Sequence, residues 1–92
     1  MDFIYEENRI WLKDINGNLV AEVTFPNVSA DVVTINHTFV DDSLRGQGIA
    51  GKLLEAVVDT LKTENKKAYS TCSYASTWFK KHPEYDYLHL EY

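Results

Sequence analysis

The sequence contains a single cysteine, Cys72, so no disulfide can form within the chain and nothing points to secretion. No apolar run approaches the roughly 18 residues that a membrane-spanning helix requires. The N-terminus, Met1–Glu7, lacks the basic region and the apolar stretch of a signal peptide. Basic residues are scarce as well: 9 Lys and Arg stand against 14 Asp and Glu, for a net charge of −5. A nucleic-acid-binding protein would show a basic stripe and a high pI. We therefore expect a cytoplasmic protein that binds neither nucleic acid nor a membrane.

What is present indicates one globular domain over residues 1–92, with 45% hydrophobic and 25% charged residues. Two strands, 9–13 and 19–25, flank Asn16-Gly17, which predicts a hairpin with positive φ at both turn positions. Residues 31–40 predict a long third strand on which Ile35, His37 and Phe39 share one face. The opposite face of that strand is also largely apolar, so we expect a central strand that is covered on both faces.

After this strand the hydrophobic period changes from two to between three and four. That change predicts an amphipathic helix over residues 47–64, which Asn65 ends. A strand over 67–72, a second helix over about 75–82 that Pro83 ends, and a last strand over 88–92 follow. A strand, helix and strand in succession imply a parallel crossover. The predicted fold is thus an α/β domain with a mixed, twisted sheet, in which an antiparallel meander precedes a β-α-β-α-β unit.

The most specific feature is a cluster of glycines where the first helix begins. Three of the four glycines in the chain are Gly46, Gly48 and Gly51. Glycine costs up to about 1 kcal/mol relative to alanine inside a helix, so this cluster indicates another use. Uncovered N–H groups at a helix N-terminus, together with the helix dipole, favour an anion such as a diphosphate. The alternative is a tight strand–helix junction in which glycine only permits close packing.

Two well-known diphosphate motifs match this segment in letters but not in context. A phosphate-binding P-loop needs Ser or Thr after its lysine, and Leu53 follows Lys52. A dinucleotide-binding fold needs an acidic residue about 20 positions further on and a much longer chain, and Thr71-Cys72-Ser73 stands at that position.

A third interpretation fits the order of the whole chain. Arg45, Gly48 and Ala50 match the Gln/Arg-x-x-Gly-x-Gly/Ala signature, and the chain resembles the GCN5-related N-acetyltransferases (GNAT). It is most similar to a short GNAT-like, acetyl-CoA-binding subfamily with three further motifs, here His37-Thr38, Cys72-Ser73-Tyr74 and His82-Pro83-Glu84-Tyr85. The resemblance implies a minimal GNAT fold with acetyl-CoA as cosubstrate. It also implies that a set of backbone groups holds the diphosphate, namely those of Arg45, Gly46, Gln47, Gly48, Ala50 and Gly51.

By the same resemblance, Phe39 and Val40 would pair with the pantetheine amides like an added strand edge. The acetyl group would point between the central strand and the strand that ends at Cys72. GNAT enzymes usually protonate the departing thiolate with a tyrosine, but Phe79 stands at that position beside Trp78, and we expect both rings in the core. The segment between the first two strands is only a turn, so the walls of an acceptor site are lacking.

These departures leave several functions open. The candidate catalytic residues are Cys72, as carrier of the acetyl group or as proton donor, Tyr74, and His37 as base or hydrogen-bonding group. An inert buried cysteine and a core histidine are the alternatives, and His82 before Pro83 is typical of a helix-end cap. The chain would then be an N-acetyltransferase acting on an unidentified amine, small or macromolecular, or a non-catalytic module that binds acetyl-CoA. A thiol redox protein fits less well, because Cys72 has no second cysteine to resolve it.

Overall fold

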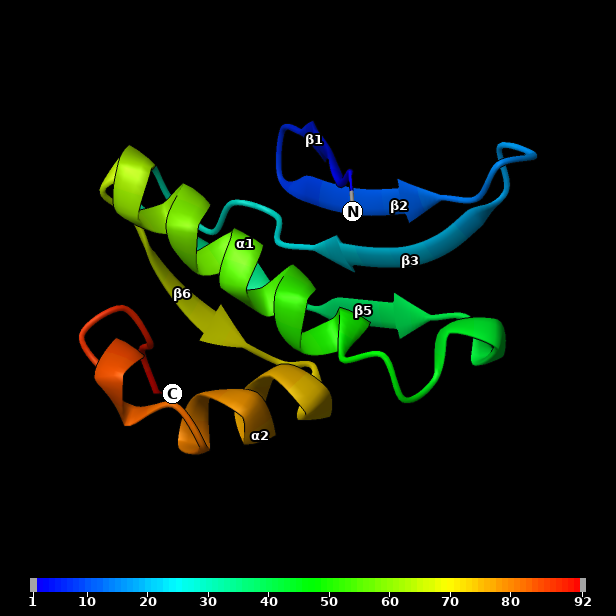
Figure 1. Cartoon of the computed structure of the whole chain (residues 1–92). Helices are drawn as coiled ribbons and strands as arrows, with labels where there is room; N and C mark the ends of the chain where they lie inside the picture. The colour runs from blue at the N-terminus through cyan, green and yellow to red at the C-terminus, as the bar shows by residue number, and fades with distance from the viewer. Residues whose placement is uncertain (1, 92) are drawn as a thin grey trace.

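Two sheets and two helices make up the computed structural model, which describes residues 2–91. The larger sheet is antiparallel in the order β1-β2-β3-β5, and the smaller one pairs β4 with β6 in parallel. Helix α1 lies across the larger sheet, and α2 lies beside β6 (Figure 1). The strands are β1 (Ile4–Glu6), β2 (Arg9–Lys13), β3 (Leu19–Thr24), β4 (Val32–Ile35), β5 (His37–Val40) and β6 (Lys67–Ser70). The helices are α1 (Ile49–Glu64) and α2 (Ser73–Lys80), with short 3₁₀ helices η1 (Asp42–Leu44) and η2 (Pro83–Tyr85). The predicted mixed α/β architecture is confirmed.

The antiparallel part differs from the prediction in two places. Strand β1 was not predicted, because it is three residues long and carries a glutamate; Asn8, with φ of +61°, forms the tight turn to β2. The β2–β3 hairpin is present, but of its two predicted positive φ angles only that of Gly17 (+86°) is found. The Asp14 carboxylate accepts hydrogen bonds from the amides of Asn16 and Asn18, both at 2.9 Å, and so holds the turn in another conformation.

The predicted single strand over 31–40 is interrupted at Asn36. Strand β4 pairs with β6, whereas β5 pairs with β3, and the Asn36 amide donates to the Thr24 carbonyl at 3.2 Å between them. The interruption changes which face each side chain takes, as a bulge does. Ile35 is fully buried, while the His37 side chain is 52% exposed and Phe39 is 37% exposed. The predictions that His37 shares a face with Ile35, and that this strand is covered on both faces along its length, are therefore wrong.

Helix α1 supplies more of the core than any other element. Its buried face consists of Ile49, Leu53, Leu54, Ala56, Val57, Val58 and Leu61, which pack on the sheet. The helix begins two residues later than predicted, because Gly48 has a left-handed backbone (φ +70°) that cannot continue into a helical turn. It ends as predicted at Asn65, whose amide donates to the carbonyls of Leu61 and Lys62.

The strands of the C-terminal part are shorter than predicted. Strand β6 ends at Ser70 rather than Cys72, and Cys72 instead precedes the first turn of α2. Within residues 2–91 the predicted last strand is reduced to one parallel bridge between Ala68 and His89, and Tyr92 lies outside the described residues. The described part of the chain has no helix that is long and apolar enough to span a membrane.

Candidate functional site

The glycine turn before α1 presents free backbone donors. The Asp41 carboxylate accepts from the Ser43 amide at 3.0 Å, and hydrogen bonds from Ser43 hold the pKa of Asp41 below its usual value. Arg45 forms an ion pair with Asp42 at 2.9 Å, with both side chains exposed. Within residues 2–91 the amides of Gly46 and Gly48 donate to no acceptor. The turn therefore leaves these donors free while its own hydrogen bonds hold the loop in place.

A small cavity of about 190 Å³ opens beside this turn. Of the predicted cofactor-binding residues, it is lined by Val40, Arg45, Gly46, Gly48 and Ala50. A Cβ atom placed on Gly46 or Gly48 would meet nothing within 4 Å, so both backbones are open to the cavity. Leu44, Ile49 and Tyr74 complete the lining. The volume suits a diphosphate group but not a whole nucleotide cofactor.

Three predicted cofactor-binding residues do not line this cavity: Phe39, Gln47 and Gly51. A Cβ atom on Gly51 would lie 3.6 Å from Nε1 of Trp78 and 4.0 Å from the hydroxyl oxygen of Tyr74. Gly51 thus faces α2, as the packing alternative requires, while Gly46 and Gly48 face the open cavity.

The interruption at Asn36 creates a wedge between β5 and the β6–α2 turn. The amides of Thr71 and Cys72 both donate to the Ile35 carbonyl, at 3.0 and 3.2 Å, and close the parallel sheet there. Beyond this point β5 turns away to pair with β3, leaving its other edge without a strand partner in the described chain (Figure 1). The Cys72 sulfur lies 3.5 Å from Oγ1 of Thr38 across the wedge. Thr38 is a site residue that the sequence analysis missed.

The environment of Cys72 favours its thiolate. Partial burial raises the pKa of the thiol, but hydrogen-bond donors outweigh this effect and hold the pKa below its usual value of 9.0. These donors are the Ala75 amide, the Thr38 hydroxyl, the Tyr74 amide and the Thr38 amide. As a neutral thiol, Cys72 forms no capping hydrogen bond with α2. The free amides at the start of α2 therefore stabilise the anion selectively.

The structure separates His37 from the other two candidate catalytic residues, Cys72 and Tyr74. Tyr74 is 43% exposed, lines the glycine-turn cavity, and has its pKa raised by burial, so its hydroxyl remains a proton-bearing donor. His37 lies on the open face of the larger sheet, where its Nε2 is 3.5 Å from Oε1 of Glu22. Neighbouring strand residues point to opposite faces, so His37 points away from Thr38, which faces Cys72. Cys72 and Thr38 form the pair that the fold positions.

Trp78 and Phe79 serve packing, as expected. Trp78 is 6% exposed and Phe79 1% exposed, and Phe79 stacks on His89 with ring centres 4.2 Å apart. His82 lies at the end of α2, where its Nδ1 donates a hydrogen bond to the Trp78 carbonyl at 2.7 Å, as a helix-end cap does. Its ring also stacks on Trp78 at 4.0 Å.

An antiparallel and a parallel sheet that separate at a wedge, next to a glycine turn at a helix N-terminus, define an acetyltransferase-like α/β domain. The chain belongs to the GCN5-related N-acetyltransferase family, whose model it matches over residues 9–88. The subfamily inferred from Cys72-Ser73-Tyr74 stays a prediction.

The chain is also similar in sequence to known proteins. The chain is 38% identical over 72 residues to Protein NATD1 of Gallus gallus, covering 77% of this chain and 66% of the relative. For Protein NATD1 of Homo sapiens the identity is 37% over 68 residues, covering 74% of this chain and 60% of the relative. The chain thus spans less than two-thirds of the length of these relatives.

Among solved structures, a GCN5-like protein from Staphylococcus aureus superposes with a TM-score of 0.82 and 34% identity, covering 99% of this chain and 89% of its own. A GNAT family acetyltransferase from Elizabethkingia anophelis with acetyl-CoA bound has a TM-score of 0.61 and 19% identity, covering 84% and 51%. At that identity the second likeness shows the fold alone.

Proposed function

We propose that the chain binds acetyl-CoA and transfers its acetyl group to an amine, with Cys72 as the intermediate carrier. The observation that carries this proposal is the Cys72 thiol, which faces Thr38 across the wedge with its pKa lowered by the start of α2. A thiolate in that position is a nucleophile without the help of a neighbouring base. The acetyl-CoA bound to the Elizabethkingia anophelis protein, which shares the fold, supports the choice of donor.

The binding half of the proposal rests on three backbone features. The free amides of Gly46 and Gly48 and the N-terminus of α1 supply donors and a favourable field for the diphosphate. The edge of β5 that has no strand partner supplies the backbone groups of Val40 for the pantetheine amides. The Phe39 backbone faces β3 instead, because alternate residues of an antiparallel strand face its partner and Asp41, two positions further on, donates to the Val20 carbonyl of β3. A pantetheine strand along that edge would carry the thioester into the wedge, toward Cys72.

The transfer half has two steps. The Cys72 thiolate attacks the acetyl carbonyl carbon, a bond from that carbon to the Cys72 sulfur forms, and its bond to the CoA sulfur breaks. CoA leaves as a thiolate and takes a proton from solvent. A neutral amine then attacks the acetyl carbon on Cys72, loses a proton to solvent, and releases the Cys72 thiolate. The amine is small or macromolecular; within the described chain no helix precedes η1, so none walls an acceptor site between the first strands.

A second candidate, a module that binds acetyl-CoA without transferring its acetyl group, is favoured by two observations. Phe79, at the position where GNAT enzymes usually carry a tyrosine acid, is buried against His89 and has no proton to give. His37 faces the other side of the sheet and does not supply a base to Cys72.

The two candidates are distinguished by intact mass spectrometry after incubation with acetyl-CoA and no acceptor, under denaturing and native conditions. We expect one covalent acetyl group on the wild type and none on Cys72→Ala, with both proteins forming the native complex. A native complex that leaves Cys72 unmodified would refute the carrier and leave the binding module.

The diphosphate assignment has a separate test. Gly48→Val should abolish the native complex, because a side chain would cover the free amides. The matched control is Gly17→Val, which places the same side chain at a similarly strained φ of +86° in a distant hairpin and should leave binding unchanged. Equal binding by both variants would refute the assignment of the glycine turn.

A further inference from the structure

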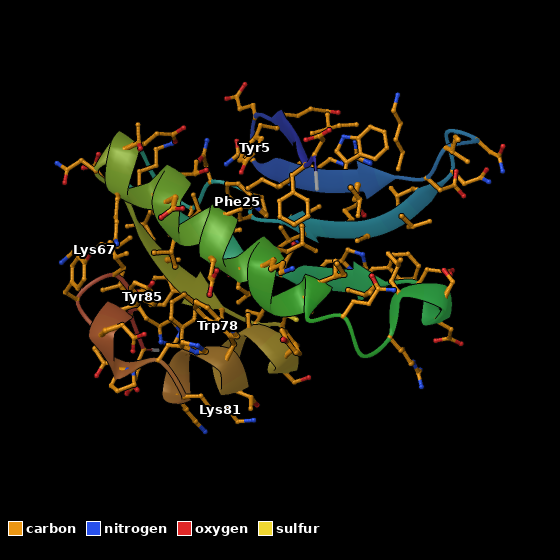
Figure 2. The ribbon with its side chains drawn as sticks, viewed as in Figure 1. Tyr5, Phe25, Lys67, Trp78, Lys81 and Tyr85 are labelled. Atoms are coloured by element: carbon orange, nitrogen blue, oxygen red, sulfur yellow. The ribbon has the colours of Figure 1, made fainter. Side chains whose placement is uncertain are left out.

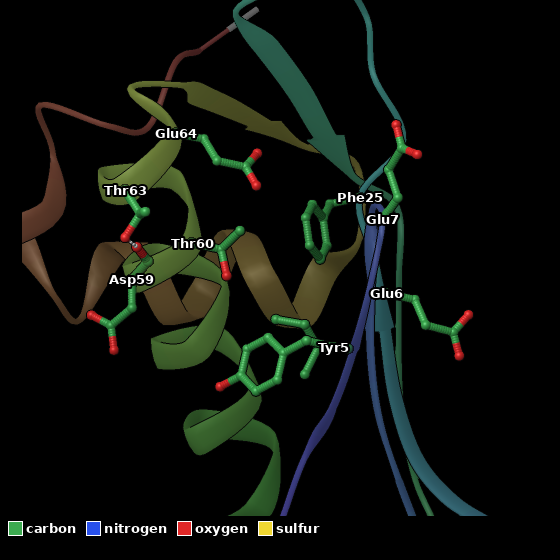
Figure 3. A pocket seen from close by; sticks show the side chains of 9 residues that line it. Tyr5, Glu6, Glu7, Phe25, Asp59, Thr60, Thr63 and Glu64 are labelled. Atoms are coloured by element: carbon green, nitrogen blue, oxygen red, sulfur yellow. Dashed lines mark hydrogen bonds between the residues drawn. The ribbon is translucent and has the colours of Figure 1, made fainter.

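A second groove lies at the other end of α1. A helix is about 10 Å wide and strands are spaced about 4.8 Å apart, so one helix covers roughly two strands. Helix α1 packs mainly on β2, β3 and β5 and leaves the inner side of the edge strand β1 uncovered. The result is a groove of about 560 Å³ between β1 and the last turns of α1 (Figure 3). It lies some ten helical residues, or about 15 Å, from the glycine turn.

The floor of the groove is apolar and aromatic. Ile10 and Phe25 are almost fully buried beneath it, while the Tyr5 ring, 61% exposed, extends from β1 toward the helix (Figures 2 and 3). The hydroxyls of Thr60 and Thr63 on its helix side are already used, because they donate to the carbonyls of Ala56 and Asp59 at 3.0 Å.

The rim is acidic and no basic residue lines it. Glu7 extends from the β1–β2 turn, and Asp59 and Glu64 extend from α1. Within residues 2–91, Glu7 and Asp59 form no ion pair, while Glu64 contacts Lys66 at 3.3 Å. Glu6 also borders the groove, but its carboxylate turns to the opposite side of the sheet, where it accepts from Trp11 and Arg9. The groove therefore concentrates negative charge with little cationic compensation.

The sheet edge beside the groove is free as well. Within the described residues, β1 pairs only with β2, so its outer backbone groups are available to another strand. An exposed edge that adjoins a lined groove is the arrangement in which an extended peptide adds as a strand and places alternate side chains in the groove. A small free amine has no peptide backbone to pair with β1, so the free edge favours a peptide as the occupant.

We propose that this groove binds an extended, basic polypeptide segment, which pairs along β1 and places lysine or arginine side chains beside Glu7, Asp59 and Glu64. This docking function is separate from acetyl-CoA binding and does not depend on whether Cys72 carries an acetyl group.

The test uses a fluorescein-labelled ten-residue peptide of alternating lysine and threonine, with binding followed by fluorescence anisotropy. In amide NMR spectra of the protein we expect the peptide to shift the signals of β1 and of residues 59–64. The variant Glu7→Gln/Asp59→Asn/Glu64→Gln should bind roughly tenfold more weakly, since each exposed ion pair contributes modestly. The control Asp31→Asn/Glu55→Gln/Glu84→Gln removes the same charge at exposed positions outside the groove and should bind within about twofold of wild type.

Several results would overturn the proposal. Equal weakening in both triple variants would mean that only net charge attracts the peptide. Amide shifts confined to the glycine turn would place the peptide elsewhere. Butane-1,4-diamine binding as tightly as the peptide would show that the β1 edge is not used. Unchanged amide spectra of the free variants away from the substitutions verify that each one is folded.

Discussion

Replacing Gly51 with alanine should stabilise the protein, although this glycine belongs to the cluster that marks the site. Gly51 has ordinary helical geometry in the first turn of α1, unlike Gly46 and Gly48 with their positive φ angles. Alanine is favoured over glycine in helices by up to about 1 kcal/mol. The new methyl group would lie 3.6 Å from Nε1 of Trp78, an ordinary van der Waals contact that requires no movement. We expect a gain of about 0.5–1 kcal/mol, the lower value applying if the first turn benefits less.

Thermal unfolding followed by circular dichroism measures this gain. For a domain of this size, 1 kcal/mol corresponds to a shift of roughly 4–8 °C in Tm, so Gly51→Ala should raise Tm by about 2–8 °C. Calorimetric titration should show unchanged affinity for acetyl-CoA, because the methyl group faces α2 and the amide is retained. Gly48→Ala serves as the contrast and should lower Tm, because its φ of +70° strains any side chain. A lower Tm for Gly51→Ala would refute the reasoning and show that α1 and α2 need to approach more closely than an alanine permits.

Three further predictions concern the wedge and the C-terminal packing. Thr38→Val removes the hydroxyl donor to the Cys72 sulfur and should raise the pKa of that thiol, which moves the pH profile of its alkylation by iodoacetamide to higher pH. An unmoved profile would show that the backbone amides act without the hydroxyl. Phe79→Ala should cost about 3–5 kcal/mol in urea unfolding, since it empties a fully buried ring site, and a cost below about 1 kcal/mol would mean that the core refills the space. Burial lowers the pKa of His89, so the unfolded chain binds more protons and stability should fall as pH drops below about 6.5. His89→Asn should lose less Tm than wild type between pH 7.5 and 5.5, and an equal loss would assign the effect to other groups.

Much of the fold could be predicted because it depends on local patterns. The period of α1, its end at Asn65, and the parallel pairing on either side of it follow from spacing and from a residue that tolerates left-handed backbone. Strand β1 could not be predicted, because three residues carry no readable alternation and its position depends on pairing with β2. The expected last strand is absent for the opposite reason: alternating residues are present, but within residues 2–91 they form only one bridge to Ala68, through the Leu88 carbonyl and the Leu90 amide.

The candidate site was predicted only in part, because its local pattern could be interpreted but its long-range pairing could not. Glycine density located the turn, but it did not distinguish Gly46 and Gly48, which face the cavity, from Gly51, which faces α2. The feature that matters most for the site, the interruption of the strand at Asn36, was not predicted. Nothing in a β-branched run from Asp31 to Val40 marks where a strand exchanges one partner for another. That exchange moved His37 to the open face and placed Thr38 opposite Cys72.

The exchange of partners at Asn36 also has a consequence for how the chain folds. Strands β1, β2, β3 and β5 pair with neighbours nearby in sequence, whereas β4 and β6 pair only after the whole of α1 has intervened. Pairings that are distant in sequence require closure of a longer loop and form later. We expect the antiparallel half to assemble first, as a platform on which α1 docks. The wedge that holds Cys72 is then completed last, and in hydrogen exchange the β6–α2 turn should open before the β2–β3 hairpin.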